Sequence, residues 1–327
     1  MSDTAAPRSA KLGDSCLREI PHLLTKEEIR DFSRIDSTRF TAAVALEICL
    51  VLAAVWISET WFNPLTYALA VVVVGSRIHA LGALMHDTVH YRAYSNRLLN
   101  DVVGEILALP TSISMAGYRN THFGHHRELN GEDDPDWRKY SKTKEYEFPA
   151  SRGNMLVRIA RHLSGLQAVV EVTRVHVYKD PDRRDIPAWV SRGRLVFLVA
   201  LAVCATVFGF WKLLLLYWVV PLLTVFLAIR YFRNVAEHYM VERENVLNET
   251  RTMLAPFWQL WLLAPWGINY HIEHHLFPSV PCFRLGKLHR LLMTRAPYPQ
   301  MAHVTHGYFG GLLRECASVH PAERVAA

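Results

Sequence analysis

Histidines are the residues of this sequence whose spacing is best suited to chemistry. Eight of the 17 histidines lie in the motifs H-D-T-V-H, H-F-G-H-H and H-I-E-H-H. They are His86, His90, His122, His125, His126, His271, His274 and His275. Residues three or four positions apart share one face of a helix, so each motif is predicted to present its imidazoles to one side. A ninth candidate, His238, follows the last long apolar run by about two helical turns.

Nine imidazoles are too many for one metal ion. Zinc sites take three or four protein ligands, so two ions with four or five ligands each would use the whole set. Imidazole suits zinc, copper, iron and nickel, and ligand type alone therefore leaves the metal open. We interpret the other histidines as structural or surface residues: His22, His79, His162, His176, His289, His303, His306 and His320.

Several acids stand close to these motifs. A ligating imidazole usually donates its second N–H to a carboxylate or a carbonyl group. Candidates for this role are Asp87, Asp133, Asp134, Asp136, Glu237 and Glu273. A solvated or salt-bridged acid is the alternative for each of them. If the third motif is helical, Glu273 faces away from the His271 side, so we expect it to support the ligands rather than to join them.

Long apolar runs would have to position the histidines. Four runs cover about residues 42–57, 64–85, 195–209 and 212–229, and the last two are separated by a tight turn. A membrane-spanning helix needs about 20 apolar residues, with a range of roughly 17–25. A stretch of 35 residues with one charge argues against buried helices of a soluble protein. We therefore predict an all-α integral membrane protein with about four transmembrane helices and a helical cap that carries the histidines.

Positive charges predict the orientation in the membrane. The connector between the first two runs has no Lys or Arg, the connector between the last two has only Lys212, and residues 91–194 contain 17. Short connectors poor in Lys and Arg lie outside, which puts the histidine cap in the cytoplasm. The expected parts are an N-terminal segment (1–40), a membrane domain (41–295) and a C-terminal tail (296–327). No basic patch with interleaved aromatics appears, so no nucleic-acid partner is expected.

The motifs resemble those of the membrane fatty acid desaturase superfamily, which includes hydroxylases and carotenoid ketolases. The similarity covers roughly residues 65–295 and includes the third motif with its neighbours, N-Y-H-I-E-H-H-L-F-P. The stretches A-L-G-A-L-M-H-D and G-E-D-D-P-D-W and the run from Arg233 to Leu291 resemble bacterial members most. The short H-D-T-V-H spacing argues against the acyl-CoA Δ9 branch. The resemblance implies a non-haem di-iron centre held by the nine histidines, O2 as co-substrate, and an electron donor of the ferredoxin or cytochrome b5 type with its reductase. It also makes Asn269 a candidate for holding a metal-bound water, and it favours the bacterial inner membrane.

The expected reaction is therefore O2-dependent desaturation or hydroxylation of a C–H bond in a fatty-acyl or other lipid-like chain. Related alternatives are oxidative decarboxylation, ketolation or epoxidation of another hydrophobic metabolite. A haem cytochrome would need histidines at two depths of the spans, and a metal transporter would need acids there, where only Glu47 occurs. A zinc hydrolase would need the glutamate that H-D-T-V-H lacks.

Two further expectations concern the spans themselves. Arg77 lies inside the second span, where a charge is expensive unless it is paired. We interpret it as the partner of an acid close to the histidines, with a clamp on a substrate head group as the alternative. A lipid chain would enter between the spans, and the small and aliphatic residues expected along its path are Ala80, Leu81, Ala83, Leu84 and Ile229.

Overall fold

The computed structural model describes residues 23–177 and 186–318, without the side chains of residues 172–177. His22, His320 and the side chain of His176 lie outside the described residues, as do the start of the N-terminal segment and the end of the tail. The first half contains α2 (Lys26–Phe32), α3 (Ser37–Thr60), α4 (Pro64–Val89), α5 (Arg97–Ala108), α6 (Met115–Glu128), α7 (Pro135–Tyr140), α8 (Arg152–Leu163) and α9 (Leu166–Val177). The second half contains α10 (Ala188–Val207), α11 (Trp211–Leu214), α12 (Leu227–His238), α13 (Phe257–Leu263), α14 (His271–Leu276), α15 (Cys282–Leu292), α16 (Tyr298–Met301) and α17 (Leu313–Glu315). Two short parallel strands, β1 (Thr252–Leu254) and β2 (Val304–His306), join the C-terminal part to the rest.

Four helices of the described chain are long and apolar enough to cross a membrane. They are α3, α4, α10 and the continuous helical rod Trp211–His238, so the predicted all-α membrane fold is confirmed. The helices extend past the apolar runs because polar residues cap their ends. Asp36, for example, accepts a hydrogen bond from the backbone N–H of Arg39 at 3.0 Å and starts α3 before the apolar run begins.

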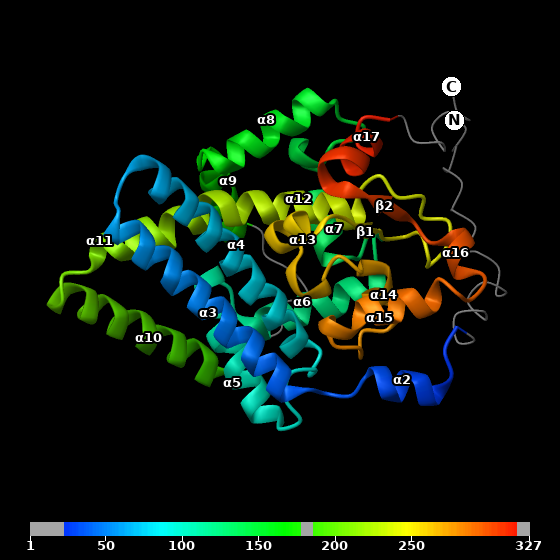
Figure 1. The fold of residues 1–327 in the computed structure, drawn as a ribbon, viewed down its shortest axis with the longest axis horizontal. Helices are drawn as coiled ribbons and strands as arrows, with labels where there is room; N and C mark the ends of the chain where they lie inside the picture. The colour runs from blue at the N-terminus through cyan, green and yellow to red at the C-terminus, as the bar shows by residue number, and fades with distance from the viewer. Residues whose placement is uncertain (1–22, 178–185, 319–327) are drawn as a thin grey trace, which may run out of the picture.

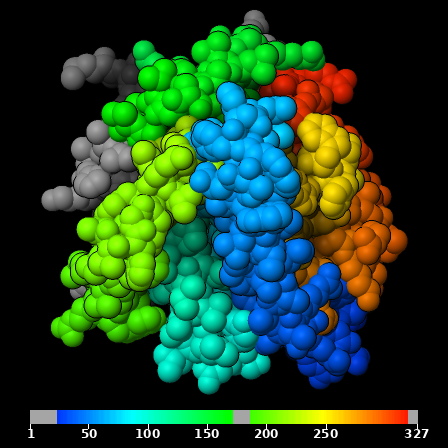
Figure 2. Space-filling model, turned by 60° about the vertical axis from the view of Figure 1, so that its left-hand side comes forward, coloured from blue at the N-terminus to red at the C-terminus, as the bar shows by residue number. Residues whose placement is uncertain are grey.

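The second span, α4, is the centre of the bundle. In its most apolar 18-residue stretch 67% of the residues are buried, against 17% for the first span and 11% for α10. Figure 1 shows α3 running beside it, and Figure 2 shows the outer side of α3 (blue) at the surface. The large apolar side chains exposed on α3 and α10 are mainly Leu, Val, Ile and Trp, as expected for helices that face lipid.

Close packing of the second and fourth spans brings two histidine-bearing ends together. Gly75 in α4 lies against the π-helical turn Leu222–Phe226 that leads into α12, and a Cβ at Gly75 would come within 2.6 Å of the Val225 Cβ. A glycine is therefore required at this contact. Pro221 supplies no backbone N–H, which is consistent with the wide π-helical turn beside it.

A buried ion pair anchors the cap to the spans. Arg77 lies 3.2 Å from the carboxylate of Glu47 in α3, and both side chains are at most 2% exposed. Arg77 also donates to the carbonyl of Trp261 in α13, and the Trp266 indole N–H donates to Glu47 at 2.9 Å. Arg77 is thus paired as expected, but its partner is an acid of the first span rather than one close to the histidines.

Candidate metal centre

Four helix ends bring the nine candidate histidines into one region. His86 lies in the last turn of α4 and His90 is its C-terminal cap, while α6 carries the second motif. His238 is the last residue of α12, and the third motif forms the short helix α14 (Figure 1). All nine are buried or partly buried, so the structure places every histidine of the predicted set at a single site.

The histidines divide into two groups. The first group is His86, His90, His122 and His274, and the second is His125, His238, His271 and His275. Within each group one ring nitrogen per residue lies within 4.8 Å of the others. Both groups draw their members from three of the four elements, which is why no single motif could form either group alone.

His126 completes the first group. Its Nε2 lies 3.0 Å from Nε2 of His122 and 2.9 Å from Nε2 of His274. Its ring also stacks on His275 of the second group, with centroids 4.3 Å apart. His126 therefore lies between the two groups, with its ring nitrogen directed at the first.

More ring nitrogens converge on one point than hydrogen bonding between imidazoles can explain. Nε2 of His122 lies 2.9 Å from Nε2 of His86, 2.9 Å from Nε2 of His90 and 3.0 Å from Nε2 of His126. One imidazole nitrogen carries either one hydrogen or one lone pair and cannot satisfy three such contacts. Two nitrogens that each bind one cation at about 2.1 Å and at right angles are about 3.0 Å apart. The donor set thus fits shared metal ions.

Basic and amide side chains hold the end of α4 in place. Arg119 of α6 donates to the carbonyls of Val89 and Thr88 at 3.0 and 2.8 Å, and Asn100 of α5 donates to Thr88 at 2.8 Å. These bonds satisfy carbonyls that a helix end leaves unpaired. They fix the segment that carries His86 and His90.

Asp134 orients His125 of the second group. Its two carboxylate oxygens lie 3.0 and 2.9 Å from His125 Nδ1, and the side chain is 1% exposed. Burial lowers the pKa of His125, but the hydrogen bond to Asp134 and the negative charges of Asp136, Asp134 and Glu237 together outweigh burial, so the net direction is upward. Because Nδ1 faces the carboxylate, Nε2 is left for the metal side.

Glu273 faces away from the metal side, as its position in the helix predicts. Its carboxylate is fully buried and accepts hydrogen bonds from Thr252 at 2.6 Å, from His289 at 2.5 Å and from the Tyr298 hydroxyl. These contacts join α14 to β1, α15 and α16. Glu273 therefore fixes the helix of the third motif rather than a single imidazole.

The remaining candidates occupy different surroundings. Glu237 accepts from Arg233 at 2.6 Å and lies 3.6 Å from His271 Nδ1. The carboxylate of Asp87 accepts from the backbone N–H of Cys282 at 3.2 Å, at the start of α15. The Asn269 amide donates to the carbonyl of Met253 at 2.8 Å.

Burial keeps most of the imidazoles neutral. It lowers the pKa of His90 to about 3 and that of His126 to about 2, and it also lowers the pKa of His122, His274 and His275. A neutral imidazole offers the lone pair that a metal requires. The charge state of the site therefore suits ligation at neutral pH.

Three supporting residues had no signal in the sequence. Thr252, His289 and Tyr298 hold Glu273 from segments 16 to 25 residues away, at no recognisable spacing. The sequence predicts a structural or surface role for His289, and its contact with Glu273 ties it to the third motif. The half-buried Tyr118 ring, which stacks on His122 at 5.1 Å between centroids, likewise has no signal in the sequence.

The fold and site together define a helical membrane protein with two neighbouring histidine groups that could each hold a metal ion. The sequence profile of the fatty acid desaturase family matches residues 60–307, so the chain belongs to that family and is an oxidoreductase. The resemblance found in the motifs is thereby confirmed.

Named relatives agree with this membership. The chain is 26% identical to dihydrorhizobitoxine desaturase of Bradyrhizobium elkanii, over 79% of this chain and 77% of the relative. It is 24% identical to the acyl-lipid omega-3 desaturase (cytochrome b5) of Arabidopsis thaliana, over 86% and 76%. It is also 24% identical to the sn-1 acyl-lipid omega-3 desaturase (ferredoxin) of Nostoc, over 84% and 79%.

Proposed function

We propose that the nine histidines hold two iron ions. His86, His90, His122, His126 and His274 would bind one ion, and His125, His238, His271 and His275 the other. The observation that carries this proposal is the convergence of ring nitrogens at about 3 Å, which hydrogen bonding between imidazoles does not explain. When bound, a non-haem iron pair supplies the O2 chemistry that oxidation of an inert C–H bond requires.

Neighbouring polar groups would position these ligands. Asp134 fixes the tautomer and the ring orientation of His125, and Glu237 is close enough to His271 Nδ1 to assist in the same way. Glu273 would act through the backbone of α14. The roles of Asp87 as the partner of a ligating imidazole and of Asn269 as the holder of a metal-bound water stay predictions. In the structure both side chains bond to backbone groups.

The substrate we infer is a long, mostly apolar chain, and the reaction is its desaturation, with hydroxylation as the alternative outcome. Oxidative decarboxylation, ketolation or epoxidation of another hydrophobic metabolite would use the same site. One relative is named for dihydrorhizobitoxine, so family membership alone does not select a fatty acid. The argument comes from the four apolar spans behind the site, because each buried CH2 contributes about 0.8 kcal/mol to chain binding. All five residues expected along the chain's path are buried: Ala80, Leu81, Ala83, Leu84 and Ile229.

Electrons would come from a separate protein. Two relatives carry cytochrome b5 or ferredoxin in their names, which supports a donor of one of these types with its reductase. Reduction of the purified protein by each donor, followed as donor oxidation in the presence of O2, separates the two.

The orientation we propose places the histidine cap on the cytoplasmic side, in a bacterial inner membrane. Residues 41–295 would form the membrane domain, with residues 1–40 and 296–327 also in the cytoplasm. Cysteines introduced at Phe62 and Trp211 should react with an impermeant thiol reagent from outside. A cysteine at Glu145 should not, and labelling there from outside would reverse the topology.

Product analysis tests the function. Lipids from cells that express the wild type should contain products that have lost two hydrogens or gained one oxygen. Cells that express His274→Ala should lack these products. Identical lipid profiles in the two strains, with iron-loaded protein present in the first, would count against a lipid substrate.

A further inference from the structure

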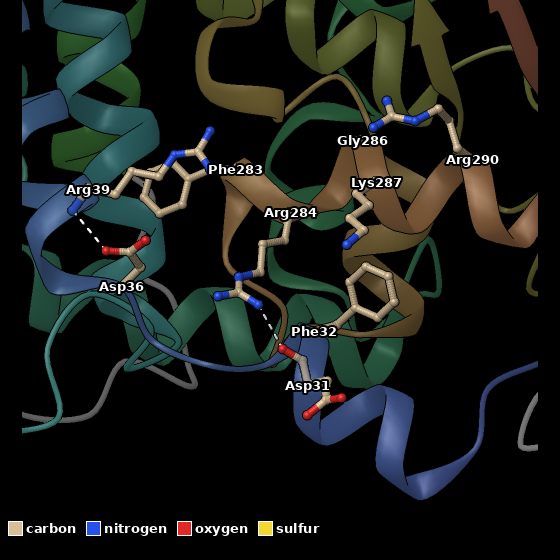
Figure 3. A pocket seen from close by; sticks show the side chains of 9 residues that line it. All are labelled: Asp31, Phe32, Asp36, Arg39, Phe283, Arg284, Gly286, Lys287 and Arg290. Atoms are coloured by element: carbon tan, nitrogen blue, oxygen red, sulfur yellow. Dashed lines mark hydrogen bonds between the residues drawn. The ribbon is translucent and has the colours of Figure 1, made fainter.

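A cationic pocket of about 500 Å³ lies outside the histidine site, between the start of the first span and α15 (Figure 3). Its four cationic side chains are Arg39 of α3 and three residues of α15, namely Arg284, Lys287 and Arg290. Its other lining residues are Asp31, Phe32, Asp36, Phe283 and Gly286.

The two acids of the pocket offset only part of the charge of its four cations. Asp31 forms an ion pair with Arg34 at 2.9 Å, and Asp36 accepts from the backbone N–H of Arg39 as the cap of α3. Lys287 and Arg290 are exposed and form no ion pair with another residue of the described chain. The pocket therefore keeps an excess of positive charge that an anionic group could meet.

The pocket lies at the depth of lipid head groups. Arg39 precedes the apolar part of α3, which starts at Ala42, by three residues or about 4.5 Å of helix. The head-group layer on each side of a bilayer is about 5–7 Å thick. A second contact joins this end of the first span to the segment before α5. The Ser37 hydroxyl, at the start of α3, donates to the carbonyl of Ala93 at 3.0 Å, and Ala93 lies four residues before α5.

Helix α5, which begins shortly after Ala93, carries an exposed apolar face. Its side chains Leu98 and Ile106 are 70% and 56% exposed. An amphipathic helix with such a face lies in the plane of the membrane interface. Both markers therefore put the pocket at the boundary between hydrocarbon and water.

The floor of the pocket is closed toward the histidines. Gly286 packs directly on the Tyr270 ring, and a Cβ at that position would come within 2.9 Å of it. The neighbouring Leu285 and Leu288 are fully buried. A bound group would therefore remain separate from the metal site, so the pocket does not serve as the entrance for the oxidised chain.

We propose that this pocket binds the phosphate of an anionic membrane phospholipid. Basic pockets at the cytoplasmic ends of spans are suited to such head groups. The lipid would join α3 to α15, and α15 in turn holds Glu273 through His289. This role does not depend on which metal or reaction the histidines support.

The test measures lipid binding by the full-length protein in detergent. Phosphatidylglycerol or phosphatidylcholine is added in mixed micelles, or inorganic phosphate at the same concentration. Bound lipid is counted by native mass spectrometry and the unfolding temperature is recorded. Phosphatidylglycerol should bind and raise that temperature, whereas phosphatidylcholine and inorganic phosphate should not.

Charge reversal identifies the site. Lys287→Glu with Arg290→Glu should weaken phosphatidylglycerol binding at least tenfold. The matched control, Lys144→Glu with Arg161→Glu, changes the same charge at a second basic hollow beside α8 and should bind as the wild type does. Equal binding by wild type and pocket variant, equal loss in the control, or equal stabilisation by inorganic phosphate would overturn the proposal.

Discussion

Replacing Asp134 with Asn should weaken the binding of one metal ion while the fold persists. Oδ1 of Asp134 accepts from the backbone N–H groups of Asp136 and Trp137 at 2.9 and 3.3 Å, and Asn can keep this cap. Oδ2 accepts from the backbone N–H of Asn130 at 2.8 Å and from His125 Nδ1 at 2.9 Å. In Asp134→Asn an amide NH2 would take the place of Oδ2. This NH2 is itself a donor and would face two other donors, the N–H of Asn130 and Nδ1 of His125.

Two losses follow from this substitution. One buried backbone donor, the N–H of Asn130, loses its acceptor, which costs about 1–3 kcal/mol of folding free energy. His125 loses its charged partner, and removal of such a partner lowers metal affinity by about ten- to a hundredfold, or about 1.4–2.8 kcal/mol. Only the group of His125, His238, His271 and His275 is affected directly.

The assay is equilibrium loading of metal-free protein at graded free Fe(II), with iron per chain measured by elemental analysis. At limiting Fe(II), Asp134→Asn should bind one iron where the wild type binds two. Asp133→Asn changes the same charge at an exposed neighbour and should load as the wild type does. Thermal unfolding first establishes that the metal-free variants are folded. A loading curve for Asp134→Asn that matches those of the wild type and Asp133→Asn would then refute the role of Asp134 in orienting His125.

Four other substitutions, one of them a control, test separate parts of the account. His274→Ala should abolish turnover, because ligands of one site act as a unit, whereas His162→Ala should remain active since its ring contacts only protein groups away from the site. Glu47→Gln should leave the Arg77 charge unpaired in the bundle and lower stability by about 3–5 kcal/mol, which thermal unfolding in detergent would report. Ala83→Trp should change the preferred chain length or the oxidised position in product analysis without a change in iron content, and unchanged products would contradict a chain path beside α4.

Local spacing predicts eight of the nine histidines, whereas the prediction of His238 depends on its place after the last apolar run and on the family resemblance. Helical geometry puts His122 and His126 on one side of α6, and the length of the apolar runs predicts four spans. The division into two groups was not accessible from sequence. Which imidazole joins which group depends on how α4, α6, α12 and α14 meet, and no motif records that packing.

The supporting residues show the same limit. Six acids near the motifs were equivalent candidates, and only the folded chain selects Asp134 for His125. The contact between His289 and Glu273, and the pairing of Arg77 with Glu47 thirty residues earlier, join segments that sequence patterns treat separately. Long-range hydrogen bonds of this kind follow from tertiary packing and leave no periodic trace.

The most direct test of the central claim is the metal content of the protein purified without added zinc and reconstituted with Fe(II). The account predicts about two iron ions per chain and no haem absorption, with the second iron lost preferentially in Asp134→Asn. One zinc ion per chain that Fe(II) does not replace, without O2-dependent turnover after Fe(II) is added, would contradict the di-iron assignment.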